Sequence, residues 1–261
     1  MTEATAQPEL ILVMPTYNEG ALVARTVRDW LDVLNRVGVV SEILILDNGS
    51  TDGSTIDLPL PGGCCGVAVL HEPRKGHCRA VLAGYRGALT ANGGTVAWVV
   101  QADADAEVPP DAFAELWRRR YDADVVLGQR MGSRSPIRGA LSSCGALLLS
   151  CLWPDASPQV GDPNVPFRLM RAGWLRAALN ELPRSPASPN LLLVAVARQL
   201  RSSVATVPVP FVARPTGQTS VRRLFTMGAR CGWQMVLLRA RGLNRKALPV
   251  HRECHADGPG V

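Results

Sequence analysis

The stretch VAWVVQADAD, residues 96–105, places an apolar run directly before two carboxylates. Short runs of Val, Ile and Leu are typical of strands buried on both faces of a parallel sheet. In an extended chain, side chains two positions apart point to the same side, so Asp103 and Asp105 would face one way. Two neighbouring carboxylates repel unless a cation lies between them, and oxygen ligands suit Mg²⁺ or Mn²⁺. The alternative is a loop whose carboxylates cap the next helix, a role for which Asp111 is better placed.

The same kind of apolar run recurs along the first half of the chain, with helical patterns between the runs. The expected strands are Leu10–Met14, Ile43–Leu46, Val67–Leu70, Val96–Val100 and Val125–Gly128. The expected helices are Ala21–Val37, Cys78–Ala91 and Asp111–Tyr121, the last following the helix-start signal Pro109-Pro110. Strands that alternate with helices predict an α/β fold: a doubly wound, mostly parallel sheet with helices on both faces.

The pattern changes after about residue 130, where apolar helices and a Pro-rich loop containing Asp162 follow. The expected elements are helices at Arg138–Leu152, Ala172–Leu182, Asn190–Arg201 and Leu224–Arg241, and an edge strand at Ser203–Val212. We expect a single catalytic domain over 1–245, with a nucleotide-binding half (1–130), an acceptor-side half (131–245) and a disordered tail (246–261).

Charge is distributed unevenly along the 261 residues. Residues 1–200 carry 18 basic and 20 acidic side chains, against 10 basic and 2 acidic in residues 201–261. A basic C-terminal region suits an anionic partner such as phosphate or an anionic membrane surface. Nucleic acid is not expected, because the three Tyr and four Phe residues are too few for a basic patch interleaved with stacking aromatics.

The C-terminal helix, 221–241, bears on membrane contact. On a helical wheel Leu224, Met227, Cys231, Met235 and Leu238 form one stripe, and Arg222, Arg223, Arg230 and Arg241 gather on the other side. Such a helix either lies on an anionic membrane or packs on its own domain with a solvated basic face. The N-terminus does not have the pattern of a signal peptide, and no apolar run reaches the ~18 residues that span a bilayer. The expectation is a cytoplasmic protein, with peripheral contact at the inner face of the membrane left open.

Polar clusters also follow the first two expected strands. Pro15–Glu19 follows the first and Asp47–Gly53 the second. In open α/β sheets ligands bind at the carboxyl ends of the strands, so these clusters and the Asp103 turn would converge on one crevice. Taken alone, the Asn48-Gly49 dipeptide favours an ordinary turn. The functional interpretation is a nucleoside pocket in which the carboxylate of Asp47 accepts hydrogen bonds.

These motifs, in this order and spacing, resemble family 2 glycosyltransferases of the A-type fold. They are PTYNEG (15–20), LDNGSTDGS (46–54), RKGHCRAVLAGYRGA (74–88), ADADAEVPPD (102–111) and VLGQR (126–130). Two later segments, DPNVPFR (162–168) and RPTGQT (214–219), resemble the polyprenol-phosphate subgroup of dolichol-phosphate mannose synthase type. The resemblance extends over about Leu10 to Arg241.

The resemblance implies a role for each matching residue. The nucleotide base and ribose would lie against Pro15, Tyr17, Glu19, Asp47 and Asn48, with Lys75-Gly76 opening a helix beside the nucleotide. Asp103 would contact the ribose or the metal, Asp105 would be the main metal ligand, and Glu107 would add a third. Arg130, Arg168 and Arg214 would contact the donor or acceptor phosphate. The implied donor is a UDP-sugar or GDP-sugar, with Mg²⁺ or Mn²⁺ and inversion at the anomeric carbon.

Departures from the family pattern gather on the acceptor side. Asn48 replaces a second Asp, residues 164–166 (NVP) replace Thr-Ser-Gly, and Thr219-Ser220 replaces a Ser-Lys pair. The Q-x-x-R-W motif of processive synthases is absent, so transfer of one sugar is expected. A lipid phosphate acceptor would need arginines and no base, whereas a soluble hydroxyl acceptor would need a base such as Asp162. Two competing hypotheses are a nucleotidyltransferase on a similar sheet and a non-catalytic nucleotide-sugar-binding protein.

Overall fold

The computed structural model describes residues 7–60, 62–72, 76–132, 136–155, 160–212 and 221–241, without the side chains of 136–138 and 221–224. Lys75, Arg214 and the predicted tail 246–261 lie outside the described residues. The predictions made for them, and the division of 1–245 into two halves, therefore stay predictions.

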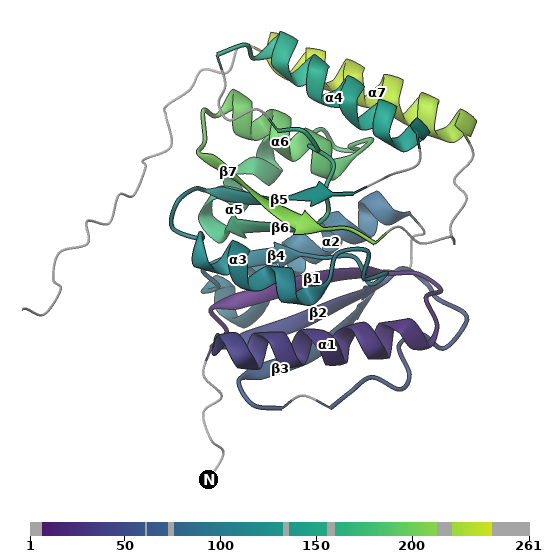
Figure 1. Cartoon of the computed structure of the whole chain (residues 1–261), viewed down its shortest axis with the longest axis vertical. Coiled ribbons are helices and arrows are strands. Elements are labelled where there is room, and N and C mark those ends of the chain that lie inside the picture. The colour runs from purple at the N-terminus through teal and green to yellow at the C-terminus, as the bar shows by residue number, and fades with distance from the viewer. Residues whose placement is uncertain are drawn as a thin grey trace, which may run out of the picture.

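Seven strands form one mixed sheet in the order β3-β2-β1-β4-β6-β5-β7 (Figure 1). β1 pairs in parallel with β2 and β4, β2 with β3, and β5 with β7, whereas β6 runs antiparallel to both β4 and β5. The strands are β1 (Leu10–Thr16), β2 (Ser41–Asp47), β3 (Cys65–His71), β4 (Trp98–Gln101), β5 (Val125–Met131), β6 (Arg168–Arg171) and β7 (Val204–Pro210).

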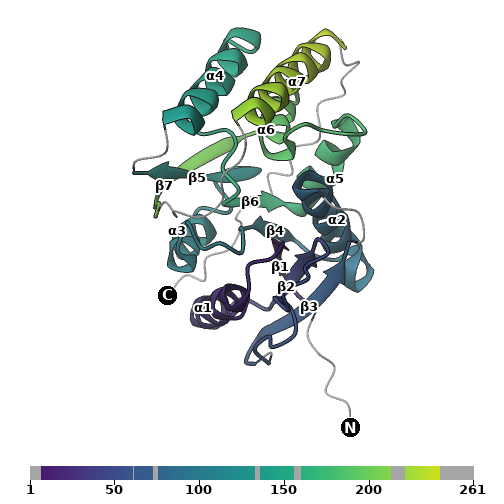
Figure 2. The ribbon, with the colours of Figure 1, turned by 90° about the vertical axis from the view of Figure 1, so that its right-hand side faces the viewer.

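Helices cover both faces of this sheet. Seen along the edge in Figure 2, α1 and α3 lie on one face, α2 and α5 on the other, and α4 and α7 side by side at the β7 end. The helices are α1 (Ala21–Val37), α2 (His77–Thr90), α3 (Phe113–Arg118), α4 (Pro136–Leu152), α5 (Ala172–Glu181), α6 (Pro189–Gln199) and α7 (Val221–Ala240), with 3-10 turns η1 (Ala91–Gly94) and η2 (Pro110–Ala112). The prediction of a mostly parallel α/β sheet with helices on both faces is confirmed.

Hydrophobic patterning explains why these segments fold as they do. All seven residues of β1 are buried, as expected for the central strand of a covered sheet. The inner side of α1 buries residues at helical spacing, including Val23, Val27, Trp30 and Leu34. The helix ends where Gly38 adopts φ 75° and its N–H donates to the carbonyls of Leu34 and Asn35.

The sequence did not predict β6. Its four residues, RLMR, begin and end with Arg, so they lack the continuous apolar run that marked the parallel strands. β6 is nevertheless buried at three of its four positions, because it lies between β4 and β5 in the middle of the sheet. The other second-half predictions hold: β7 is an edge strand, and α4 to α7 lie where the helical patterns placed them. In the part of the chain that is described, none of the helices is long and apolar enough to span a bilayer.

Candidate active site

The candidate site lies where the direction of strand order reverses. From β1 the sheet extends through β2 to β3 on one side and through β4 on the other. The loops after β1 and β4 therefore diverge at their carboxyl ends and leave room for a ligand between them. Ala102 stays beside β1, since its N–H donates to the carbonyl of Val13 at 3.2 Å. The Asp103–Asp105 turn consequently begins at this point.

Alternation places the two aspartates on the accessible side of this turn. Ala102 and Ala104 are buried, while Asp103 and Asp105 are partly exposed. The hydroxyl of Thr26, on α1, donates to the carbonyl of Ala104 at 3.0 Å and fixes the turn against the domain. The carboxylate of Asp105 accepts the N–H of Glu107 at 3.1 Å. Ala104 and Asp105 form a turn rather than a continuation of the strand, so the shared direction of the two carboxylates stays a prediction.

The surroundings of the Asp103 carboxylate disfavour its charged form in the metal-free protein. Its buried Oδ1 has no hydrogen-bond partner. Burial is the largest influence on its pKa, which is raised; the charge of Asp105 raises it further, whereas the charges of His77 and Arg130 and the side chain of Gln101 oppose the rise. A divalent cation would supply the missing partner and relieve the repulsion. The donor set, two carboxylates open to phosphate oxygens and water, fits Mg²⁺ or Mn²⁺.

Glu107 does not join this pair. Within the described residues, no three His, Cys, Asp or Glu side chains lie close enough together to hold a metal ion. The Oε2 atom of Glu107 instead lies 3.7 Å from Nη1 of Arg130. The role of Glu107 as a third metal ligand stays a prediction, and in this structure its carboxylate lies beside Arg130.

The two loops predicted to hold the nucleoside are joined to each other by hydrogen bonds. The loop after β1 has positive φ at Asn18 and Gly20, which turns its backbone N–H groups toward the loop after β2. Tyr17 is exposed beside them, Glu19 is partly exposed, and Pro15 is buried within β1. The bonds run from the N–H of Asn18 to Ser50, of Thr51 to Asn18, of Glu19 to Ser54, and of Gly20 to Asp52 and Ser54.

Asp47 stabilises the turn that follows β2, and it is also a residue of the predicted nucleoside pocket. Its Oδ1 accepts the N–H of Ser50 at 2.9 Å, and its Oδ2 lies 3.0 Å from Nδ1 of His71 at the end of β3. Burial would raise its pKa, but the hydrogen bonds from Ser50 and the pairing with His71 outweigh burial, so the pKa is lowered. Both the turn interpretation and an ionised pocket carboxylate are consistent with this geometry. Sequence reasoning missed His71, which only strand pairing brings to Asp47.

Asn48 connects the nucleoside loop to the helix that follows the Lys75-Gly76 motif. Its side-chain Oδ1 accepts the N–H of Gly76 at 3.2 Å, and Gly76 is the N-cap of α2. Gly76 has φ 140°, a conformation that favours glycine. An amide oxygen accepts this bond as a carboxylate would, so the replacement of Asp by Asn at this position preserves the contact while removing a charge.

Arg130 and Asp162 form an ion pair that joins the end of β5 to the loop before β6. The Nε of Arg130, on β5, donates to Oδ2 of Asp162 at 2.7 Å, and the hydroxyl of Ser142, on α4, donates to Oδ1 at 2.7 Å. The side chain of Asp162 is fully buried, while that of Arg130 is 13% exposed. Ser142 gave no signal in the sequence, since it is one of several serines in an apolar helix.

Arg168 is placed differently from the prediction. It is fully buried, and its guanidinium donates to the carbonyls of Val165, Asn190 and Pro163 at 3.0, 2.9 and 3.3 Å. Burial lowers its pKa. Two of these carbonyls belong to the 162–166 loop, so the guanidinium fixes that loop, and the predicted contact of Arg168 with phosphate stays a prediction. Val212 is the last described residue before the segment that contains Arg214. Its N–H donates to the carbonyl of Glu107 at 2.8 Å.

A buried polar network links the two sides of the site. The hydroxyl of Tyr85, on α2, donates to Oε1 of Gln101 at the end of β4 and lies 3.4 Å from Oδ1 of Asn190 on α6. Asn190 in turn accepts from Arg168. Burial raises the pKa of Tyr85, so the phenol stays protonated. Sequence reasoning missed Tyr85, whose aromatic ring in a helical pattern resembles an ordinary core residue.

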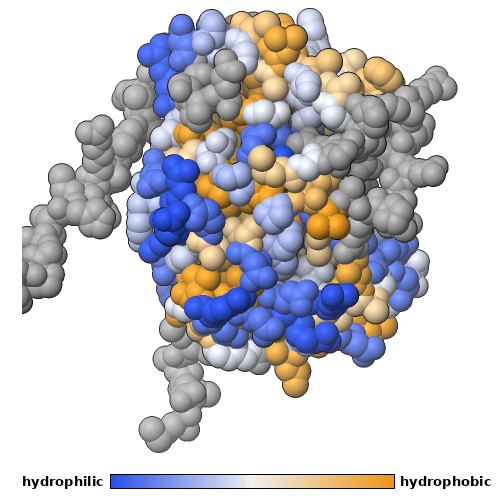
Figure 3. All heavy atoms as spheres, in the orientation of Figure 1, coloured by the Kyte–Doolittle hydropathy of each residue, from blue (hydrophilic) through white to orange (hydrophobic). Residues whose placement is uncertain are grey.

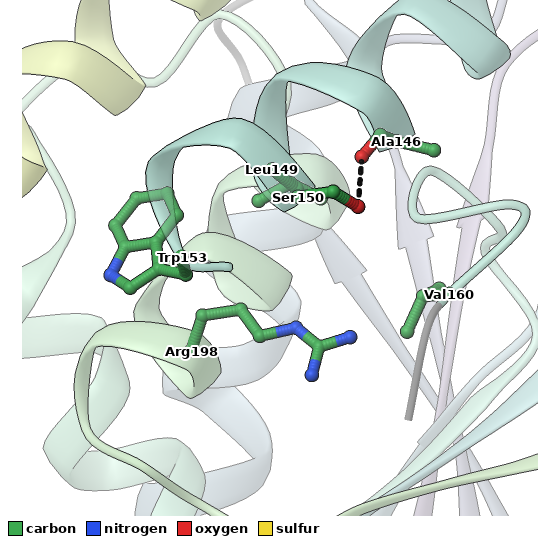
Figure 4. Close-up of a pocket in the computed structure, with 6 residues that line it drawn as sticks. All are labelled: Ala146, Leu149, Ser150, Trp153, Val160 and Arg198. Atoms are coloured by element: carbon green, nitrogen blue, oxygen red, sulfur yellow. Dashed lines mark hydrogen bonds between the residues drawn. The ribbon is translucent and has the colours of Figure 1, made fainter. Parts of the chain in front are cut away.

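A separate pocket lies at the C-terminal end of α4 and holds none of the predicted site residues. Figure 4 shows Arg198 extending from α6 toward it, with Trp153 and Val160 on either side. Its lining consists of Ala146, Leu149, Ser150, Trp153, Val160 and Arg198.

The model of the family "Glycosyl transferase family 2" matches residues 11–140, which include β1 to β5 and the Asp103–Asp105 turn. The chain belongs to glycosyl transferase family 2. The family 2 segment therefore contains both carboxylates, the two loops predicted to hold the nucleoside, and Arg130. Asp162 and Arg168 lie beyond it.

The names of two curated relatives of this family 2 chain describe transferases of undecaprenyl phosphate. An undecaprenyl-phosphate 4-deoxy-4-formamido-L-arabinose transferase of Pseudomonas paraeruginosa (strain DSM 24068 / PA7) is 31% identical over 129 residues, 47% of this chain and 35% of that protein. The protein of that name from Enterobacter sp. (strain 638) is 29% identical over 131 residues, 49% of this chain and 38% of that protein. The similarity thus spans well under half of these relatives.

Solved structures extend the comparison over the whole fold. Glucosyl-3-phosphoglycerate synthase from Mycobacterium tuberculosis, in complex with Mn²⁺, uridine-diphosphate and glucosyl-3-phosphoglycerate, superposes with a TM-score of 0.63 at 21% identity, covering 90% of this chain and 81% of that one. Its complex with phosphoglyceric acid gives a TM-score of 0.62 at 20% identity, with coverage of 91% and 82%. The family 2 chain has the A-type glycosyltransferase fold.

Proposed function

We propose that this family 2 chain transfers one sugar from a nucleoside diphosphate sugar to a phosphate-bearing acceptor, with Mg²⁺ or Mn²⁺ as cofactor. The observation that carries the proposal is the buried, unpartnered Oδ1 of Asp103 beside Asp105 at the reversal point of the sheet. A carboxylate left in this state destabilises the free protein, and it is stabilised when a cation and its phosphate ligands occupy the crevice.

The donor half of the proposal rests on the two joined loops. The carboxylate of Asp47 and the accessible ring of Tyr17 border the end of β1, where a base and ribose would lie. The Asn48–Gly76 contact orients the first turn of α2 toward the same place. A UDP-sugar is the first donor to test, because relatives of this fold have been solved with uridine-diphosphate and Mn²⁺. A GDP-sugar is the second.

The reaction would be a direct displacement at the anomeric carbon with inversion. Bound metal supplies electrostatic stabilisation of the departing diphosphate. Arg130 lies on β5, and its positive charge acts on Asp103 by lowering the pKa of that carboxyl group. A guanidinium group binds phosphate through two N–H groups at once, and Asp162 holds the guanidinium of Arg130 in position from the buried side.

The state of Asp162 favours a phosphate acceptor. A hydroxyl acceptor needs a base with a lone pair free to take a proton. Asp162 is fully buried and accepts from both Arg130 and Ser142, so it is engaged as an acceptor already. A phosphate oxygen is largely ionised near neutrality, since its second pKa is about 6, and needs no base. The names of the curated relatives suggest a polyprenyl phosphate, which would bring the protein to the inner face of the membrane.

A soluble acceptor is the second candidate. The neighbour solved with phosphoglyceric acid has the same fold over 91% of this chain. Such an acceptor would present a hydroxyl, and Asp162 would have to exchange Ser142 or Arg130 for that hydroxyl. Glycosylation of a small phosphorylated molecule in the absence of lipid would favour this candidate over the lipid one.

The test is a thermal-shift screen of UDP, GDP and their sugars with and without Mn²⁺, followed by turnover with the donor that binds. A ligand at 100 times its Kd stabilises the fold by about 2.7 kcal/mol. Asp105→Ala should lose the Mn²⁺-dependent shift, while Asp111→Ala, an exposed carboxylate paired with Arg36, should keep it. Equal shifts in the two variants would contradict the site. Binding without turnover on any acceptor would favour a non-catalytic nucleotide-sugar-binding protein.

A further inference from the structure

The helices α4 and α7 form a layer beyond the β7 end of the sheet. Both views place them side by side (Figures 1 and 2). They approach closely because α7 has glycine where α4 lies. A Cβ built on Gly228 would come within 3.5 Å of Leu141, and one built on Gly232 within 3.3 Å of Leu148. The two helices therefore pack closely against each other and together form one surface.

Three residues of the apolar stripe predicted for α7 face inward, whereas Met227 of the same stripe is 38% exposed. Cys231, Met235 and Leu238 are buried, and α7 packs on α6. Gln234 fixes this orientation, since its side chain accepts the N–H of Ala187 at 2.9 Å and donates to the carbonyl of Ser185 at 3.0 Å. Cys231, Met235 and Leu238 thus belong to the domain core, and an external partner must meet a different side of this part of the helix.

The outward side of the layer is apolar as well. Trp233 is 63% exposed and Phe225 60% exposed on α7, and Leu147 is 66% exposed on α4. In Figure 3 hydrophobic residues lie along the upper rim, where Figure 1 places these two helices. We call this side the outer face and define it by Leu147, Phe225, Trp233, Val236 and Leu237. An exposed apolar group of this kind marks an interaction surface.

Charge indicates what would cover the outer face. The two helices together contain five arginines and no acidic residue. Arg239 on α7 and Arg241 just beyond it are exposed. Exposed Trp and Phe between arginines match the boundary of an anionic bilayer, where aromatic rings lie among headgroups and arginines meet lipid phosphates. A second copy of this chain would bring the same positive charges together.

We propose that the outer face of α4 and α7 docks on an anionic lipid surface. Preference for lipid over another partner rests in part on the proposed phosphate-bearing acceptor. The same helix, α4, carries Ser142, which holds Asp162 beside Arg130. Docking through this face would hold α4 at the membrane, with the Asp162–Arg130 pair on the inward side of that helix. The substrate class that follows is a lipid-borne phosphate.

The experiment measures binding of the full chain to vesicles of phosphatidylcholine, with and without phosphatidylglycerol, by co-sedimentation. The wild-type protein should bind the anionic vesicles, and less at high salt. Trp233→Glu should weaken binding on the order of tenfold or more. Leu60→Glu is the matched control, because Leu60 is also exposed but lies in the β2–β3 loop. It should bind as the wild type does.

Tryptophan fluorescence gives a second measurement that does not depend on a charged variant. All six tryptophans fall in the described ranges, and only Trp233 is exposed, the buried five being Trp30, Trp98, Trp117, Trp153 and Trp174. Brominated lipid in the anionic vesicles should quench the wild type. It should quench Trp233→Phe, which retains an aromatic ring for binding, far less.

Three results would overturn the inference: no vesicle binding by the wild type, unchanged binding by Trp233→Glu, or quenching that is equal in Trp233→Phe. A dimer in solution that Trp233→Glu dissociates would assign the outer face to a second copy instead. Failure of the proposed function is distinguishable, because vesicle binding without sugar transfer to a lipid phosphate would support docking and refute the acceptor.

Discussion

Asp162 and Arg130 meet at 2.7 Å, Oδ2 to Nε, although they are 32 residues apart in the sequence. Arg130 is the penultimate residue of β5, and Asp162 lies in the loop before β6. The carboxylate is fully buried, so the pair has little solvent screening on that side. It therefore fixes the guanidinium more firmly than an exposed ion pair would.

Removal of Asp162 should consequently cost stability as well as activity. Asp162→Ala leaves a largely buried guanidinium without its counter-charge, at a cost of about 3 kcal/mol in the free energy of unfolding. For a chain of this size that corresponds to a fall of roughly 6–12 °C in Tm. Asp111→Ala removes the exposed partner of Arg36 and should change the free energy by under ~0.5 kcal/mol. Chemical denaturation of the two variants measures both values, and equal losses would refute the role given to the pair.

Asp103 should behave in the opposite way in the metal-free protein. Burial and the neighbouring Asp105 disfavour its charge, and its Oδ1 lacks a hydrogen-bond partner. Asp103→Asn removes that charge at nearly constant volume, so the variant should melt at a higher temperature than the wild type without metal. With Mn²⁺ and nucleotide the order should reverse, because only the wild type gains stability from the ligands. A lower Tm in the metal-free variant would mean that the carboxylate already has a stabilising partner.

Asp47 gives a prediction for acid pH. Its pKa is lowered from the ordinary 3.8, despite burial, by Ser50 and His71. A lowered carboxyl pKa stabilises the fold fully above the unfolded value, and the contribution disappears as pH falls through the lower, folded value. The Tm difference between the wild type and Asp47→Asn should accordingly be constant above about pH 5 and shrink below pH 3.8. Scans at several pH values would test this, and a difference that grows in acid would contradict it.

The parallel half of the fold could be predicted because buried parallel strands leave a local signal. Val96–Val100 and Leu10–Met14 are continuous apolar runs, and polar residues follow each of them directly. Since the carboxyl ends of parallel strands share one edge, the convergence of the Asp47 and Asp103 turns followed from sequence. The predicted pairing of Asp103 with Asp105 rests on the two-residue period of an extended chain.

The acceptor side could not be predicted in this way, because its contacts join residues far apart in sequence. Ser142 reaches Asp162 only after α4 has folded back over the sheet, and no spacing rule relates them. Arg168 has the appearance of a binding residue, yet its neighbours are carbonyls that become buried with β6. On a helical wheel of α7, both the buried side and the outer face carry apolar residues. The buried side is the one that packs on α6, with Gln234 bonded to the backbone of Ser185 and Ala187.

Close approach between helix and sheet gives the last prediction, at Gly84 on α2. A Cβ built there would lie 2.4 Å from Cγ1 of Val13 and 2.8 Å from Cδ2 of Leu46, both fully buried. Gly84→Ala should therefore push α2 off β1 and β2 and cost about 1–3 kcal/mol, even though alanine is the better helix former. Gly173, near the start of α5, has nothing within 4 Å of a built Cβ, so Gly173→Ala should be neutral or stabilising by up to about 1 kcal/mol. Because α2 also begins at Gly76 beside Asn48, Gly84→Ala should weaken nucleotide binding in the thermal-shift screen while Gly173→Ala leaves it intact. If the two substitutions changed stability by the same amount, the packing of α2 would not be the constraint that places the first turn of this helix at the site.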